Sequence, residues 1–132
     1  MSRLDYPFLK FKLGDYPRPF LPITILNPHS GMHMDSYALV DTGADECAFP
    51  ASFAEILGHN LTSGKQKHID TGNGSTMAYG HTSRIIIDEY DSGEITIDYL
   101  PNLDTHLLGV QSFLVNFIVT LNYPESIISL EH

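Results

Sequence analysis

Short strand-like runs separated by turn residues fill most of the sequence, and this alternation of strands and turns restricts the fold more than any other feature. Residues 8–13 alternate apolar and polar side chains before Gly14-Asp15, which predicts a strand followed by a turn. Asn73-Gly74 and Asp91-Ser92-Gly93 are typical of hairpin turns. The same reasoning predicts further strands at 22–26, 36–40, 84–88, 94–99, 117–121 and 126–129.

Two short helices complete the expected secondary structure, at 51–57 and 112–117. About eight short strands and so little helix predict an all-β domain, built as a closed barrel or a folded-over sheet. The sequence has no second compositional block, so we expect a single domain over residues 1–129. Residues 130–132 are interpreted as the remnant of an expression tag.

One segment, residues 37–45, combines an apolar run with a reactive side chain. Its Ala-Leu-Val stretch predicts a buried strand, and that strand ends abruptly at Asp41-Thr42-Gly43. Gly43 allows a tight turn and leaves space above the carboxylate. The tripeptide alone has low specificity, because Asp70-Thr71-Gly72 repeats it without the apolar lead. We therefore assign the chemistry to Asp41 and interpret the second copy as a coincidence.

The flanking sequence resembles the retropepsins, the single-domain aspartic proteases of retroviruses and their cellular and bacterial relatives. Residues 39–44 match the apolar-apolar-Asp-Thr/Ser-Gly-Ala strand of that family. A glycine-rich hairpin follows at 71–75, and an apolar-apolar-Gly strand with a short helix follows at 107–114. The order and spacing of these landmarks are more specific than the tripeptide.

The resemblance implies a retropepsin-like aspartic endopeptidase that cuts extended polypeptides as a homodimer, without a metal or other cofactor. Asp41, Thr42 and Gly43 are the expected catalytic residues. The interval between Asp41 and Asp70 is too short to hold a second folded lobe, so each chain would supply one catalytic aspartate. Two facing carboxylates then share a proton. One activates a water molecule, and the protonated one polarises the scissile carbonyl.

Further site residues follow from the same resemblance. Thr42 aligns with a threonine that hydrogen-bonds across the dimer axis, and residues 72–74 would form the tip of a flap that closes over the substrate. Met77 and Leu103 are further candidates for pocket walls. The expected substrate-binding residues are Ala44, Asp45, Glu46, Gly72, Asn73, Gly74 and Leu107.

The sequence departs from the viral members in two places. Those proteins commonly carry a basic or amide residue directly after the late glycine, where it braces the acidic segment, but Val110 stands there in this chain. The bracing is therefore expected to be missing. The segment before Asp41 is also longer, so the terminal dimer sheet of the viral enzymes is not assumed.

Metal chemistry and cysteine chemistry are weaker alternatives. His29 and His33 are four residues apart, but Pro28 and Gly31 argue against the helix that would place them on one face. Cys47 is the only cysteine and follows the active-site segment in an apolar run. We expect it to be a core residue rather than a nucleophile.

Charge and hydropathy restrict the partners. Sixteen acidic and seven basic residues give a net charge of -9, which disfavours binding to nucleic acid and to anionic membranes. No apolar run is long enough for a membrane span or a secretion signal, so a cytoplasmic protein is expected.

Two other interpretations stay open. The chain could be a retropepsin-like module that binds a polypeptide without cutting it. It could also be a domain cut from a larger, membrane-anchored or fused protein. The intact Asp-Thr-Gly-Ala favours catalysis, because a pure binding module has no reason to keep a costly pair of facing carboxylates.

Overall fold

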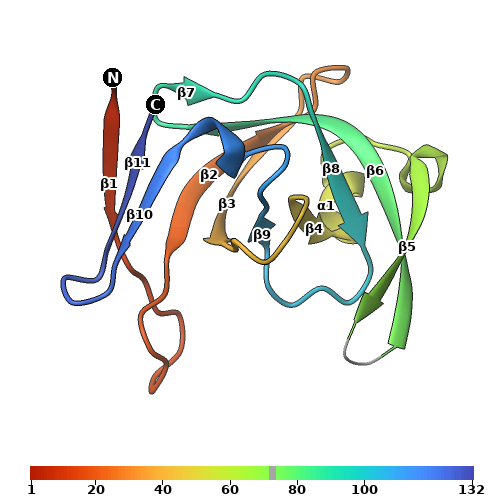
Figure 1. The fold of residues 1–132 in the computed structure, drawn as a ribbon. Coiled ribbons are helices and arrows are strands. Elements are labelled where there is room, and N and C mark those ends of the chain that lie inside the picture. The colour runs from red at the N-terminus through yellow and green to blue at the C-terminus, as the bar shows by residue number, and fades with distance from the viewer. Residues whose placement is uncertain (72–73) are drawn as a thin grey trace.

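The computed structural model describes residues 1–71 and 74–132, and its strands form two sheets (Figure 1). The helical elements are short: α1 at Ala51–Ile56 and the 3₁₀ turns η1 at Leu61–Ser63 and η2 at Leu114–Asn116. The strands are β1 Arg3–Pro7, β2 Phe20–Leu26, β3 His33–Val40, β4 Ala48–Pro50, β5 Lys65–Thr71, β6 Gly74–Ile87, β7 Tyr90–Asp91, β8 Ile95–Leu100, β9 Leu107–Leu108, β10 Ile118–Asn122 and β11 Ile127–Glu131.

The larger sheet folds over on itself and confirms the all-β prediction. Its strands follow the order β2-β3-β9-β4-β8-β6-β5, and β2 also pairs with β6, so that the path of strands closes. Alternate residues of β2 (Leu21, Ile23 and Ile25) are buried against Ala38 and Val40 of β3, as the period of two of a strand requires. The predicted helix at 51–57 is confirmed as α1, which packs on β4 and β8.

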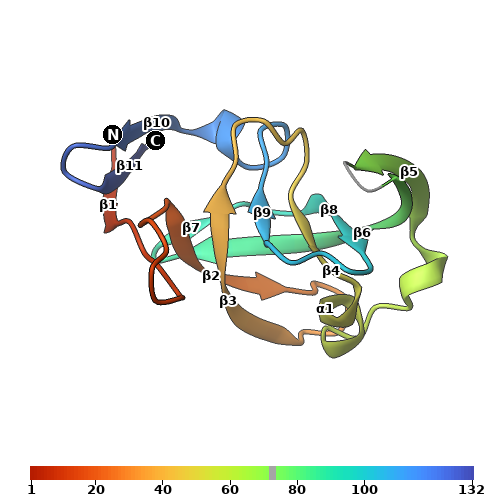
Figure 2. The same ribbon diagram turned by 90° about the horizontal axis from the view of Figure 1, so that it is seen from below.

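The order of β3, β9 and β4 within the sheet positions the loop that follows β3. β9 lies between the two other strands, parallel to β3 and antiparallel to β4. After Val40 the chain therefore has to pass over β9 before it re-enters the sheet at Ala48 (Figure 2). Residues 41–47 form this crossing loop.

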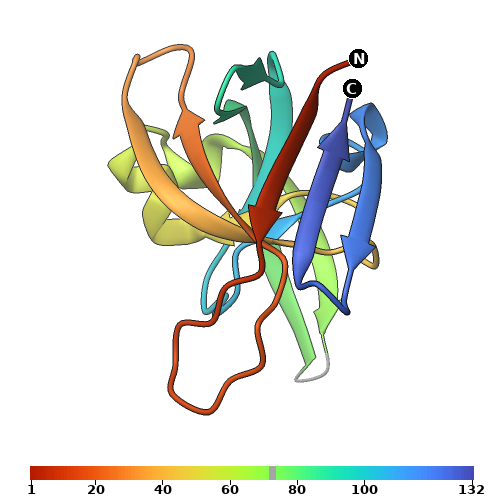
Figure 3. The ribbon, with the colours of Figure 1, turned by 90° about the vertical axis from the view of Figure 1, so that its left-hand side faces the viewer.

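The terminal strands form a separate three-stranded sheet within the chain, in the order β1-β11-β10 (Figure 3). Ile128 and Leu130 of the central strand are fully buried. Leu130 belongs to the segment interpreted as a tag remnant, and in this structure it is part of the hydrophobic core.

The predicted strand at 8–13 is wrong. The strand lies earlier, at 3–7, because β11 offers its backbone hydrogen bonds to those residues. Beyond Phe8, the pairing is reduced to an isolated bridge between Leu9 and Arg18, and Leu13 is fully exposed. The alternating pattern therefore belongs to a long loop, visible at the bottom of Figure 3.

The predicted hairpin around Asp91-Ser92-Gly93 is also displaced. β6 continues to Ile87 and turns at Asp88, whose φ is 49°, so that Ile86 and Ile87 pair with β7. β8 pairs with residues 79–83 of β6 instead of 84–88. The reason is that β2 already pairs with β6 over residues 84–86.

A polar cluster lies beside the paired strands β6 and β8. The Ser83 hydroxyl is buried and lies 2.9 Å from the Tyr99 hydroxyl. His59 Nε2 lies 3.4 Å from Ser83 Oγ. The centroid of the His59 ring lies 4.6 Å from that of His81, and the two rings are tilted by 31°. Burial, followed by repulsion from His81 and His29, lowers the pKa of His59 to about 4.

We expect His59 to make the protein less stable as the pH falls from about 6.5 to about 4. In this window the unfolded chain takes up a proton at His59 and the folded chain does not, so protonation favours unfolding. Because the ring is partly exposed to solvent, the penalty is expected to be about 1 kcal/mol, or about 3 °C in Tm. His59→Gln should reduce the difference in Tm between pH 7 and pH 4.5, whereas His33→Gln, at an exposed position, should not. An unchanged pH dependence in His59→Gln would contradict the assignment.

Candidate active site

Asp41 is the first residue after β3, and backbone hydrogen bonds fix the turn that carries it. Its N–H donates to the carbonyl of Leu108 at 3.1 Å, and its own carbonyl accepts from the N–H of Ala44 at 3.1 Å. Its Oδ1 accepts from the N–H of Gly43 at 2.9 Å. The carboxylate is half-buried, while Thr42 and Gly43 are exposed. The turn therefore holds an accessible carboxylate in one orientation.

Gly43 also lies close to the carboxylate. A Cβ at this position would be 3.2 Å from Asp41 Oδ1, which is tighter than most such contacts. The small residue expected beside the aspartate therefore has a steric reason in this structure.

The crossing loop is braced by the segment after β9. The N–H of Val110 donates to the carbonyl of Ala44 at 2.9 Å, and the N–H of Gln111 donates to the carbonyl of Asp45 at 2.7 Å. Ser112 Oγ donates to Glu46 Oε2 at 3.0 Å. Backbone groups and a serine therefore brace this loop, in place of the side chain that the viral members carry at the position of Val110.

Gly109 allows this close approach. A Cβ there would lie 2.3 Å from the carbonyl carbon of Glu46 and 2.4 Å from its oxygen. Glu46 is half-buried, and its Oε2 is hydrogen-bonded to Ser112 within the chain. Asp45 is exposed and remains available to a ligand.

Cys47 follows the crossing loop and is fully buried. Its Sγ accepts hydrogen bonds from the Gly109 N–H at 3.4 Å and from Ser112 Oγ at 3.8 Å. Burial raises the pKa of the thiol to about 11, so the reactive thiolate is disfavoured. The prediction of a core cysteine agrees with this environment.

The antiparallel hairpin of β5 and β6 extends to the same side of the molecule as the end of β3 (Figure 1). Gly72 and Asn73, predicted at its tip, lie outside the described residues, and Gly74 begins β6 with a φ of 113°. Asp70 lies on this hairpin, where its Oδ1 accepts from Ser75 Oγ at 2.8 Å. Asp41 and Asp70 thus lie on different elements, and of the two only Asp41 is on the crossing loop.

The base of the hairpin is attached to the neighbouring strands by apolar packing, and to β8 by an ion pair. Buried Ala48, Ala78 and Leu100 pack against the half-buried Ile69, Leu103 and Leu107. Lys67 Nζ lies 2.6 Å from Oδ2 of the buried Asp98. Two of the predicted pocket-wall residues, Leu103 and Leu107, thus share one cluster between the hairpin and β3. Met77 is half-buried on β6, paired with His68.

Within residues 1–71 and 74–132, no three histidine, cysteine or acidic side chains are arranged to hold a metal ion. In the same ranges, no helix has the length and apolar character that a membrane span needs.

Comparison with known proteins gives a match at the level of the fold. The sequence matches no family profile and no curated protein sequence. Among solved structures, the chain is similar to a retropepsin-like aspartic protease from Rickettsia conorii, with a TM-score of 0.70 and 22% identity over 98% of this chain and 99% of that one. It is also similar to the EIAV protease in complex with the inhibitor HBY-793, with a TM-score of 0.53 and 16% identity over 76% of this chain and 88% of that one. The chain therefore has a retropepsin-like fold.

Proposed function

We propose that the protein is an aspartic endopeptidase whose active site forms between two copies of the chain, each of which contributes Asp41. The observation that carries the proposal is the placement of an accessible carboxylate on a braced loop at the end of β3, within a retropepsin-like fold. Bacterial and viral proteins with this fold are named as proteases.

The need for two copies follows from the chemistry. Peptide hydrolysis without a metal or a covalent intermediate needs one group that accepts a proton from water and another that donates one to the carbonyl. A pair of close carboxylates does both, since the pair shares a single proton. Each chain offers one Asp-Thr-Gly carboxylate at the end of β3, that of Asp41, so the second comes from a partner copy. The Thr42 hydroxyl is exposed and has no hydrogen-bond partner in the part of the chain that the structure describes, which leaves it free to bond across the dimer axis.

The substrate would lie extended between the β5–β6 hairpin and Asp41. Leu103 and Leu107 are the proposed apolar walls, and Asp45 is the proposed contact to the peptide backbone, because its side chain is exposed. Ala44 and Glu46 position the loop through their hydrogen bonds to Val110 and Ser112. The residues 72–74 are the proposed tip of the flap.

The proposal is tested by incubating the protein with a diverse peptide library between about pH 3 and pH 7 and identifying the cleaved bonds. We expect cleavage at internal bonds, with a specific activity that falls on dilution as the dimer dissociates. A peptide in which a hydroxyethylene group replaces the scissile amide should inhibit, because it mimics the tetrahedral intermediate. A folded, dimeric protein that cleaves no peptide would favour the binding module instead, and a specific activity independent of concentration down to the monomer would contradict the shared site.

A further inference from the structure

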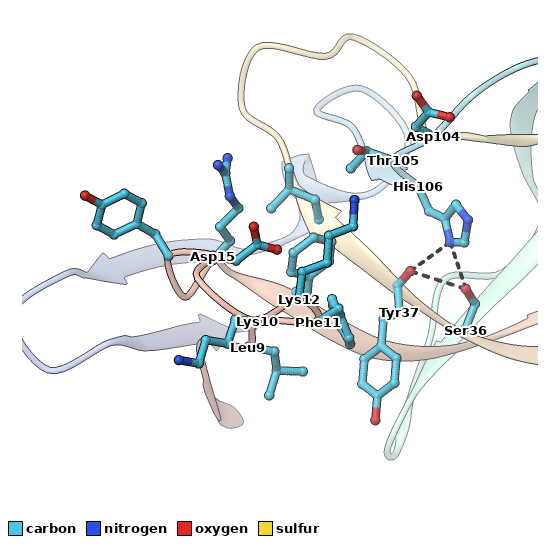
Figure 4. Close-up of a pocket in the computed structure, with 14 residues that line it drawn as sticks. Leu9, Lys10, Phe11, Lys12, Asp15, Ser36, Tyr37, Asp104, Thr105 and His106 are labelled. Atoms are coloured by element: carbon cyan, nitrogen blue, oxygen red, sulfur yellow. Dashed lines mark hydrogen bonds between the residues drawn. The ribbon is translucent and has the colours of Figure 1, made fainter.

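An open cavity of about 510 Å³ lies beside the proposed active site, under the loop that connects β1 to β2. Its walls come from three parts of the chain: residues 9–20, the outer face of β3, and residues 104–106 (Figure 4). The loop 104–106 is attached to β3, since His106 Nδ1 lies 3.0 Å from both the carbonyl oxygen of Tyr37 and Ser36 Oγ.

One end of the cavity lies near Asp41 along the chain. Tyr37 and Leu39 point to the same side of β3 and line the cavity, and Asp41 is the first residue after this strand. Leu39 is about 7 Å from Asp41 along the strand, a distance that two residues of an extended peptide span. A polypeptide bound over Asp41 can therefore place a side chain in this cavity.

The floor of the cavity is apolar and aromatic. The centroid of the Phe11 ring lies 4.9 Å from that of Phe20 and 5.3 Å from that of Tyr37. Phe11 is nevertheless 56% exposed and Tyr37 is 47% exposed. Such a floor offers apolar surface on which the methylene groups of a long polar side chain can pack.

Basic side chains gather at the cavity although they are scarce in the protein. The chain carries a net charge of -9 and only seven basic residues, yet three of them, Lys10, Lys12 and Arg18, line this cavity. Two acids also line it, Asp15 and Asp104, so the lining lacks the excess of acidic side chains found in the protein as a whole. Among residues 1–71 and 74–132, ion pairs form at Arg3, Lys67 and Arg84, and none forms at the three cations of the cavity.

We infer that the cavity binds an acidic side chain of the polypeptide substrate within about four residues of the scissile bond, with Lys12 as its principal partner. Figure 4 shows the Lys12 side chain extending across the cavity, whereas the Lys10 side chain extends away from it. The methylene groups of a glutamate side chain would lie on the floor formed by Phe11 and Tyr37, while its carboxylate would pair with the Lys12 ammonium group. The inference deepens the proposed function and rests on it.

The test uses a peptide that the wild type cleaves, made in matched versions with Glu or Gln at each of the four positions on either side of the cut. At one of these positions we expect kcat/KM to be about tenfold higher for Glu than for Gln, the size of effect of one charge-assisted hydrogen bond. Lys12→Gln should remove the preference, and Lys12→Glu should reverse it in favour of a Lys-containing peptide. Lys10→Gln is the matched control and should retain the preference.

The outcomes separate this inference from the proposed function. Cleavage that depends on Asp41, with equal rates for Glu and Gln peptides at all positions, overturns the charge preference and leaves the peptidase intact. A preference that survives in Lys12→Gln overturns the assignment of the site to the cavity. If the folded protein cleaves nothing, fluorescent peptides of one fixed sequence, with Glu or Gln placed at each position in turn, serve as binding probes instead. Tighter binding of the Glu peptide that is lost in Lys12→Gln then supports the cavity without the peptidase, and equal binding overturns it.

Discussion

Asp41→Asn is expected to reduce kcat/KM for peptide cleavage at least about 10³-fold without unfolding the protein. An amide cannot accept the proton of the attacking water, and in a homodimer the substitution removes both members of the carboxylate pair. The fold should persist, because the Oδ1 atom of asparagine still accepts the hydrogen bond from Gly43 N–H that aspartate accepts at 2.9 Å. The measurement is cleavage of one peptide by wild type and variant, with Tm recorded for both.

Asp70→Asn is the matched control, since the sequence offers the same Asp-Thr-Gly around both residues. Asp70 lies on β5 and bonds to Ser75 within the hairpin, so its replacement should change kcat/KM by less than about tenfold. Equal losses in both variants would contradict the assignment of Asp41, as would undiminished cleavage by Asp41→Asn. An Asp41→Asn protein that is unfolded would be replaced in the test by Asp41→Glu, which keeps the charge and displaces it.

The parts of the site that could be predicted are those encoded by neighbouring residues. The run before Asp41 is apolar because β3 is central in the sheet, and the abrupt change to Asp-Thr-Gly marks where the chain leaves that sheet. Pro50 and Gly58 likewise delimit α1 locally. These signals depend on a few adjacent side chains, so they can be recognised in the sequence.

The parts that could not be predicted depend on residues far apart in the chain. Ser112 reaches Glu46 across 66 positions, and nothing near either residue indicates the pairing. The alternating residues 8–13 have the pattern of a strand, but the available partner strand β11 pairs with 3–7. The loop that results carries Lys12 to the wall of the cavity, so the failed strand prediction and the unforeseen cavity have one cause.

Gly109 shows that a glycine visible in the sequence can be required by a contact with a residue far away in the chain. Gly109 follows Leu107-Leu108, and its resemblance to a family landmark does not explain why a glycine is needed. The structure supplies the reason, because the backbone of Glu46 lies within 2.8 Å of where a Cβ would be. Gly109 is needed for space rather than for an unusual φ, since it is not among the glycines with positive φ.

Gly109→Ala is therefore expected to lower the free energy of unfolding by about 3 kcal/mol or more. The new methyl group overlaps the Glu46 carbonyl, and the crossing loop has little freedom to move away, because Ala44 and Asp45 are hydrogen-bonded to Val110 and Gln111. Any relief displaces the loop that carries Asp41, so molecules that remain folded should also lose activity. The measurements are denaturant unfolding and peptide cleavage per folded molecule.

Gly93→Ala is the matched control, because it adds the same methyl group at an exposed position where no atom lies within 4 Å. Its φ of 70° should cost about 1 kcal/mol, through backbone strain alone, and cleavage per folded molecule should not change. A Gly109→Ala protein as stable as Gly93→Ala would show that the crossing loop can yield at Glu46. If that protein also retained full activity, the rigid attachment of the loop to the segment after β9 would not be what holds Asp41 in place.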